Sequence, residues 1–286
     1  MERGTAGTRQ LRRRLRDVAV LFVHSNLLIS LAATSVAFST MWLVGVSADP
    51  VPLFIVFAAT LFVYSLNRLT DIEEDRQNVP RRAAFIERYG KPLFAAGVAL
   101  YLGAIAVAVW LGLPGAPFLI LPAVVAALYS TFKIKQRLLV KNLVVGVAWG
   151  IIPLGVGVYY GVLWTPEVLF AFVFVTVMLT VAAAIFDIKD IEGDRAEGIR
   201  TFPIVFSPAA TRWGAAVITV LVAAGVVVAV ATGVVSHRAL VFLSLSAYVF
   251  AYIPFASRDR GPLFYGFVVD GEHVFLGAVV LLVEWL

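Results

Sequence analysis

The sequence contains no cysteine, and only 14% of its 286 residues are charged. The absence of cysteine excludes disulfide bonds. The scarcity of charge argues against an ordinary soluble domain, in which about a quarter of the residues are charged. Hydrophobic residues instead make up 61% of the chain, and the mean hydropathy is +0.93. The composition therefore indicates an integral membrane protein.

Nine apolar segments approach or exceed the roughly 20 residues that a helix needs to cross a bilayer. We expect these spans at residues 18–45, 51–69, 92–112, 116–132, 141–161, 166–187, 210–232, 239–256 and 263–286. The first run is long and no A-x-A site follows it, so we expect a membrane span and not a cleaved signal peptide. No linker or low-complexity segment separates the spans. We therefore predict an all-α membrane protein with a single domain over residues 1–286.

The basic residues are distributed on one side of this arrangement. The net charge of +5 could suggest a nucleic-acid partner. With nine spans, however, all Lys and Arg residues except Arg238 lie in the basic segment 1–17 or in loops and span ends on its side. This is the positive-inside pattern of membrane topology. It predicts a multi-pass protein of the cell membrane with a cytoplasmic N-terminus and its C-terminus on the opposite side, and no nucleic-acid partner.

Two polar stretches interrupt the apolar pattern at the cytoplasmic ends of the second and sixth spans. They place carboxylate or amide side chains three or four residues apart: Asn67, Asp71 and Asp75 in "NRLTDIEEDR", and Asp187, Asp190 and Asp194 in "FDIKDIEGDR". Residues at this spacing share one face of a helix. The equivalent positions of the two stretches predict a four-span unit used twice, with the ninth span added.

Clustered carboxylates repel one another and are costly near lipid unless a cation compensates them. Oxygen donors with no His or Cys nearby suit Mg²⁺, which often bridges to substrate phosphates. Basic loops follow both stretches. Together these are the parts needed to hold a diphosphate through metal ions and to stabilise the charge as it leaves. Either stretch alone would be typical of a solvated helix end, and it is the matched pair that favours a metal site.

At these residues the chain resembles the UbiA superfamily of intramembrane prenyltransferases. The N-x-x-x-D-x-x-x-D motif of that family matches Asn67, Asp71 and Asp75, and its D-x-x-x-D motif matches Asp190 and Asp194. The stretch "DIKDIEGDRAEGIRTFP" is similar to the flank of the second motif. "YSTFKIKQRLLVKN" resembles a Y-x-x-x-K stretch of the family and contains Tyr129, Lys133 and Asn142. The resemblance implies nine helices bundled around a central cavity, with cytoplasmic loops capping the active site.

The resemblance also implies roles for individual residues. Two Mg²⁺ ions are expected, one held by the first motif (Asn67, Asp71, Asp75) and one by the second with its neighbour (Asp187, Asp190, Asp194). Asp71, Asp190 and Asp194 would be catalytic, as would Lys133, which would bind the diphosphate beside Tyr129. From charge and position we add Arg68 and Arg200 as contacts of the diphosphate. Departures from the family pattern occur at Arg68 and at "HSN", residues 24–26.

Polar residues inside two other spans are further candidates. His24, Ser25 and Asn26 could line the pocket of the acceptor, with Asn26 as the substrate-binding candidate, or could form hydrogen bonds between helices. Asp270, Glu272 and His273 interrupt the last span. They could provide a general base, because a buried carboxylate binds a proton more readily than one in water. Alternatively, they could pair with one another.

These patterns predict Mg²⁺-dependent transfer of a prenyl group from an isoprenyl diphosphate to a lipophilic acceptor inside the membrane, with membrane lipid as a further partner. The resemblance leaves the acceptor open between a quinone precursor, a glycerol-phosphate lipid, a chlorin and a carotenoid. Intramolecular cyclisation of the prenyl cation uses the same motifs. A secondary transporter is the alternative from another class, and it would place ionisable residues near the bilayer midplane. A soluble terpene synthase would have amphipathic helices, which nine apolar spans argue against.

Overall fold

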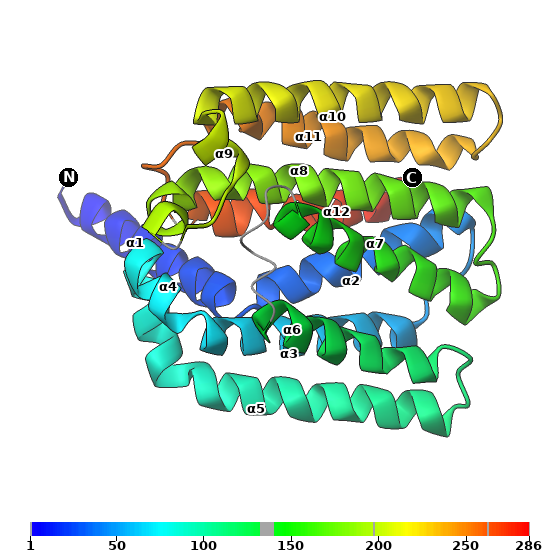
Figure 1. The fold of residues 1–286 in the computed structure, drawn as a ribbon, viewed down its shortest axis with the longest axis horizontal. Coiled ribbons are helices and arrows are strands. Elements are labelled where there is room, and N and C mark those ends of the chain that lie inside the picture. Colours follow the sequence, from blue (N-terminus) through cyan, green and yellow to red (C-terminus); the bar gives the residue numbers. More distant parts are fainter. Residues whose placement is uncertain (1, 132–139, 197, 262, 286) are drawn as a thin grey trace.

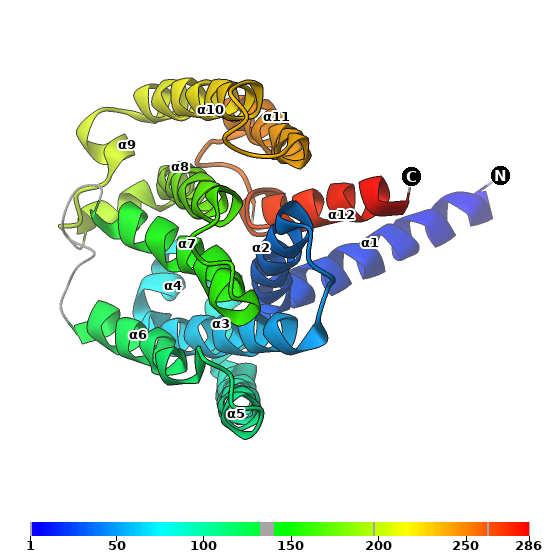
Figure 2. The same cartoon turned by 90° about the vertical axis from the view of Figure 1, so that its right-hand side faces the viewer.

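The computed structural model describes residues 2–131, 140–196, 198–261 and 263–285, and it contains helices and no strands within these ranges. The long helices from α2 onward lie side by side as a bundle, and the short helices α4 and α9 lie at the same end of it (Figure 1). Viewed from the side, α8 lies inside the bundle between the α10–α11 pair and α7 (Figure 2). The predicted all-α membrane fold is confirmed.

The helices follow the apolar runs of the sequence. In chain order they are α1 (Glu2–His24), α2 (Leu27–Val44), α3 (Pro50–Thr70), α4 (Ile72–Asn78), α5 (Pro80–Trp110), η1 (Ala116–Ile120), α6 (Leu121–Thr131), α7 (Val140–Tyr160), α8 (Pro166–Ala196), α9 (Phe202–Val205), α10 (Pro208–Ala231), η3 (His237–Val241), α11 (Phe242–Tyr252), η4 (Ile253–Phe255), the π-helical η5 (Phe264–Val269) and α12 (Glu272–Trp285). Among the described residues, eight helical segments are long and apolar enough to cross a membrane. The span expected at 116–132 forms a shorter apolar helix over Ala116–Ala126, so the count of nine remains a prediction.

The boundary of the first span differs from the prediction. Residues 18–24 belong to the basic helix α1, and α2 begins only at Leu27. Between the two helices Asn26 adopts a left-handed conformation with φ of 63°. Asparagine tolerates this region better than most residues, and its side-chain Nδ2 donates to Ser65 Oγ at 3.4 Å. The predicted span 18–45 is therefore interrupted, and the break places His24 and Asn26 beside α3.

Close packing of α7 against α8 depends on two glycines one turn apart. A Cβ atom at Gly146 would collide with Thr180 Oγ1 and with the backbone oxygen of Thr176, and one at Gly150 would collide with Thr176 Oγ1. Small residues at this spacing let two membrane helices approach closely, which replaces the hydrophobic driving force that is weak in lipid. The contact brings the start of α7 next to the acidic end of α8.

We expect Gly146→Val to lower the free energy of unfolding by about 1–3 kcal/mol, because overpacking a tight helix contact forces both helices to shift. Gly155→Val is the matched control, since it puts the same residue in the same helix where no atom lies within 4 Å of the added Cβ. Thermal unfolding in detergent measures both variants. Equal unfolding midpoints would show that the contact between α7 and α8 is not tight.

Candidate functional site

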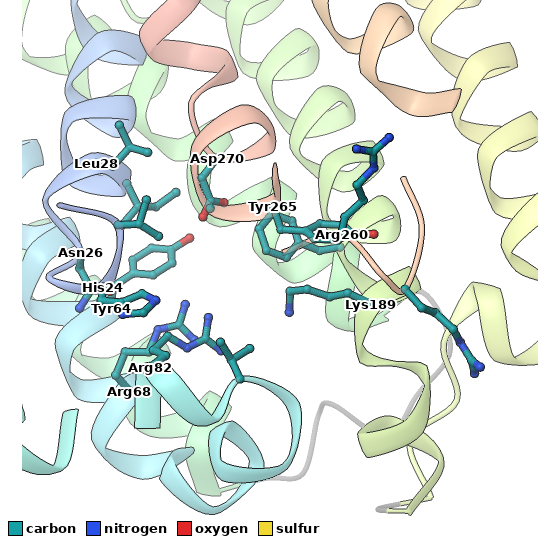
Figure 3. A pocket seen from close by; sticks show the side chains of 16 residues that line it. His24, Asn26, Leu28, Tyr64, Arg68, Arg82, Lys189, Arg260, Tyr265 and Asp270 are labelled. Atoms are coloured by element: carbon teal, nitrogen blue, oxygen red, sulfur yellow. The ribbon is translucent and has the colours of Figure 1, made fainter. Parts of the chain in front are cut away.

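A cavity of about 110 Å³ lies where the break between α1 and α2 meets α3, α5, α8 and the segment leading into α12 (Figure 3). Its charged lining consists of five basic residues and one acidic residue: Arg68, Arg82, Lys189, Arg258, Arg260 and Asp270. The excess of basic side chains suits an anionic ligand. Because the lining comes from both halves of the chain, the site requires the whole bundle.

His24 and Asn26 form one wall of this cavity. His24 is only 4% exposed, and its Nε2 has no hydrogen-bond partner within the described part of the chain. Burial lowers the pKa of His24 to about 4, and the charges of Arg82 and Arg68 act in the same direction. The imidazole is therefore neutral at physiological pH and can offer a hydrogen bond to a ligand without adding charge. Asn26, a substrate-binding candidate from the sequence, does lie at the cavity.

The first acidic stretch spans a junction between two helices. The helix α3 ends at Thr70, α4 begins at Ile72, and Asp71 lies between them with φ of −100°. The backbone bonds continue across the junction, since the Asp71 amide donates to Asn67 O and the Asp75 amide donates to Asp71 O, both at 2.9 Å. The stretch was expected on one continuous helix, and that expectation is wrong at Asp71. The side-chain Oδ1 of Asn67 is buried without a hydrogen-bond partner among the described residues.

Asp75 is buried and lies in an ion pair with two arginines. Both its oxygens accept from the Arg82 guanidinium, with Nε at 2.8 Å from Oδ2, and Arg68 Nη1 lies 4.0 Å from Oδ2. Burial by itself would raise the pKa of Asp75, but the hydrogen bonds from Arg82 and the charges of both arginines outweigh it and lower the pKa. Asp75 is therefore ionised and holds α4, α3 and the start of α5 together.

The second acidic stretch lies on α8, where Asp187 and Asp194 are almost fully buried. Lys141 Nζ, from the start of α7, lies 3.0 Å from Asp187 Oδ1 and 3.7 Å from Asp194 Oδ1. Asn142 Nδ2 donates to the other oxygen of Asp187 at 2.9 Å. The Asp190 carboxylate contacts Lys189 Nζ at 2.6 Å. The acidic side chains are thus compensated by basic residues of α7 and α8.

The donor atoms of the two stretches fit Mg²⁺ in chemical type, because carboxylate and amide oxygens are its preferred protein ligands. Asn67 Oδ1, which is buried and has no hydrogen-bond partner among the described residues, is a further oxygen that could bind the ion. However, no group of three or more His, Cys, Asp or Glu side chains in the described ranges is arranged to hold a metal ion. An ion would therefore have to compete with Arg82, Lys141 and Lys189 for these oxygens. The assignment of two ions to the two motifs stays a prediction.

The remaining sequence candidates fall in different places. Arg68 lines the cavity, whereas Arg200 is exposed in the loop after α8 and does not line it. Lys133 and the side chain of Tyr129 lie outside the described residues. From the sequence alone, the other basic residues are interpreted only as topology signals. Lys141 could have been singled out, because it lies next to Asn142 at the very start of an apolar span.

The three polar residues near the start of α12 separate into two groups. Glu272 Oε2 accepts a hydrogen bond from the Tyr252 hydroxyl at 2.7 Å, and Glu272 Oε1 lies 3.4 Å from His273 Nδ1. Both residues are 1% exposed and neither lines the cavity. Asp270, in contrast, does line it.

Comparisons with known proteins agree with the resemblance noted in the sequence. The sequence model of the UbiA prenyltransferase family matches residues 18–264. The digeranylgeranylglyceryl phosphate synthase of Methanobrevibacter smithii is 37% identical over 87 residues, which are 30% of this chain and 30% of that protein. The enzyme of the same name from Methanosphaera stadtmanae is 28% identical over 172 residues, or 58% of this chain and 60% of that protein. The chain thus matches less than two thirds of the length of either relative.

Solved structures share the fold. A UbiA homologue from Aeropyrum pernix K1, in its apo form, superposes with a TM-score of 0.66 at 20% identity and covers 90% of this chain and 98% of its own. A UbiA homologue from Archaeoglobus fulgidus bound to DMAPP and Mg²⁺ gives a TM-score of 0.63 at 13% identity, covering 92% of this chain and 96% of its own. At these identities the likeness establishes the architecture of the bundle.

Proposed function

Because the chain belongs to the UbiA prenyltransferase family, we propose that it transfers a prenyl group from an isoprenyl diphosphate to a lipophilic acceptor within the membrane, with Mg²⁺ as cofactor. The observation that carries this proposal is the basic cavity, which lies at the same end of the bundle as both acidic stretches. The related fold bound to DMAPP and Mg²⁺ supports the type of donor and metal.

In this mechanism the two acidic stretches would hold Mg²⁺ through Asn67, Asp71, Asp75, Asp187, Asp190 and Asp194. Bound Mg²⁺ would neutralise the diphosphate and make it a better leaving group. Arg68 and Lys189 attract the phosphate oxygens into the cavity, and Lys133, Tyr129 and Arg200 are further proposed contacts. The catalytic set is Asp71, Asp190, Asp194 and Lys133.

The surroundings of the cavity suit an allylic cation. Tyr64, Phe186 and Tyr265 are part of its lining, and their π faces can stabilise a positive charge. The apolar helices keep bulk water from capturing the cation before the acceptor does. Family membership gives no support to the transporter alternative.

We propose a glyceryl phosphate lipid as the acceptor. Two relatives carry the name digeranylgeranylglyceryl phosphate synthase, and an anionic head group would complement the basic lining of the cavity. Quinone precursors, chlorins, carotenoids and intramolecular cyclisation are the competing outcomes. We also propose that this end of the bundle and the N-terminus face the cytoplasm and the C-terminus the opposite side of the cell membrane.

The test is a transfer assay with the purified full chain in detergent, radiolabelled geranylgeranyl diphosphate, and acceptors of each class. We expect diphosphate release and a labelled lipid product, and a loss of roughly 100-fold or more in rate with EDTA, since metal charge is worth several kcal/mol in the transition state. Restoring Mg²⁺ after EDTA is the control. Failure to consume dimethylallyl, geranyl or geranylgeranyl diphosphate with any acceptor would contradict the proposed function.

A further inference from the structure

Asp270 lies at a break in the last membrane span. The preceding segment η5 is π-helical, and α12 begins at Glu272, so Asp270 occupies the turn between them. π-Helical turns inside helices occur frequently at functional sites, because they displace a side chain from the regular register. Figure 3 shows the Asp270 carboxylate directed into the cavity, on the side away from Arg68 and Arg82.

The charged groups around the cavity have other partners. Arg82 is hydrogen-bonded to Asp75, Arg68 Nη1 lies 4.0 Å from the same carboxylate, and Lys189 contacts Asp190. Two further basic residues have contacts on the outer loop, where Arg258 lies 3.5 Å from Glu192 and Arg260 Nε donates to Phe255 O at 3.1 Å. Within the described part of the molecule, the Asp270 side chain makes neither a hydrogen bond nor an ion pair. It is therefore the carboxylate that the cavity leaves to a ligand.

An ionisable side chain in a membrane span is costly, and one without a protein partner needs a reason to be there. Glu272, only two residues along the chain, shows how a buried carboxylate with a purely structural role is accommodated. Its carboxylate is fully buried, accepts from Tyr252 and faces His273. Asp270 has none of these contacts and instead faces the space that a substrate would fill.

We propose that the cavity takes the head group of an acceptor bearing a hydroxyl nucleophile, and that Asp270 is a catalytic residue that accepts the proton of that hydroxyl. This inference rests on the proposed function. In the transfer the acceptor oxygen forms a bond to C1 of the prenyl group while its O–H bond breaks. The bond from C1 to the diphosphate oxygen breaks, the diphosphate leaves with the electron pair, and the proton moves to the Asp270 carboxylate.

The arrangement of the cavity supports such an acceptor. Arg82 lies across the cavity from Asp270, so an anionic group on the acceptor can face it while the hydroxyl faces the carboxylate, and Arg68 remains for the diphosphate (Figure 3). The neutral His24 and the amide of Asn26 line the same cavity and can bind the polar part of the head group. A purely apolar acceptor would leave the Asp270 carboxylate and His24 Nε2 without a partner within the described part of the chain.

The experiment compares Asp270→Asn with Glu272→Gln in the full chain, because each replaces one carboxylate by an amide of similar shape. With an alkylglyceryl phosphate as acceptor, we expect Asp270→Asn to lower kcat about 10²- to 10³-fold, the range typical of a lost general base. Binding of geranylgeranyl diphosphate with Mg²⁺ should stay within about threefold of wild type, since Asp270 contacts the acceptor. Glu272→Gln should keep kcat within about threefold, because its carboxylate does not line the cavity.

A second variant separates a chemical role from a structural one. Formate added to Asp270→Ala should restore part of kcat, because the space left by the missing carboxylate opens onto the cavity. Formate should not affect Glu272→Ala, because Glu272 does not line the cavity. An Asp270→Asn enzyme that keeps nearly full kcat, or that loses binding of the prenyl diphosphate, would overturn the inference. So would a product with a new C–C bond in place of a C–O bond. If wild type itself consumes no prenyl diphosphate, the proposed function fails before Asp270 is tested.

Discussion

Asp71→Asn and Asp190→Asn are each expected to reduce prenyl transfer by about 10³-fold or more. Each change removes the charge of a proposed metal ligand and leaves its shape nearly unchanged. In typical enzymes, the loss of one neutral hydrogen-bond donor to a developing negative charge lowers kcat by about 10²- to 10³-fold. The loss of a charged metal ligand should lower kcat by at least as much. The reduction should appear in kcat, because the metal acts on the charge that develops as diphosphate leaves.

Asp190→Asn should cost only moderate stability, because the amide oxygen can still accept a hydrogen bond from Lys189, its neighbour on the same helix. Initial rates over a range of Mg²⁺ concentrations measure the loss, and unfolding midpoints confirm that both variants are folded. Asp259→Asn is the matched control, since Asp259 is exposed in the loop that also carries Arg258 and Arg260. Retention of more than a tenth of the wild-type rate in both variants would rule out the proposed metal motifs.

Eight of the nine expected spans correspond to long apolar helices in the described ranges, and they could be predicted from sequence because a bilayer imposes a simple length rule. The break at Asn26 could not. The local stretch "HSN" contains neither Gly nor Pro, and the left-handed conformation is accompanied by a contact with Ser65 on another helix. A tertiary contact of this kind leaves no periodic signal in the sequence.

The candidate site likewise combines features that could be predicted from the sequence with others that could not. The spacing of carboxylates placed Asp187 and Asp194 on one face, and both do contact a single cation. The partner, the Lys141 ammonium group, was not predictable, because its position depends on how closely α7 packs on α8 at Gly146 and Gly150. Spacing identifies which residues share a face, whereas packing decides which face they meet.

Lys141 provides the second test with a large expected effect. Its ammonium group lies between two buried carboxylates of α8, and those carboxylates would be left without this charge in Lys141→Met. Breaking a buried ion pair by removing one partner typically costs about 3–5 kcal/mol. We therefore expect Lys141→Met to lose about that much unfolding free energy in EDTA, measured by denaturant unfolding in detergent. Lys91→Met, at an exposed lysine of α5, should change stability little.

Adding Mg²⁺ then distinguishes a metal site from a purely structural ion pair. If Asp187 and Asp194 are metal ligands, Lys141→Met should bind Mg²⁺ more tightly than wild type, because the ion no longer competes with the ammonium group. A metal at 100 times its Kd stabilises the folded state by about 2.7 kcal/mol, so Mg²⁺ should recover a large part of the loss. If Mg²⁺ raises the stability of wild type and Lys141→Met equally, the two aspartates serve only to hold α7 on α8. In that case the metal of the second motif would depend on Asp190, and Asp190→Asn alone should abolish Mg²⁺-dependent activity.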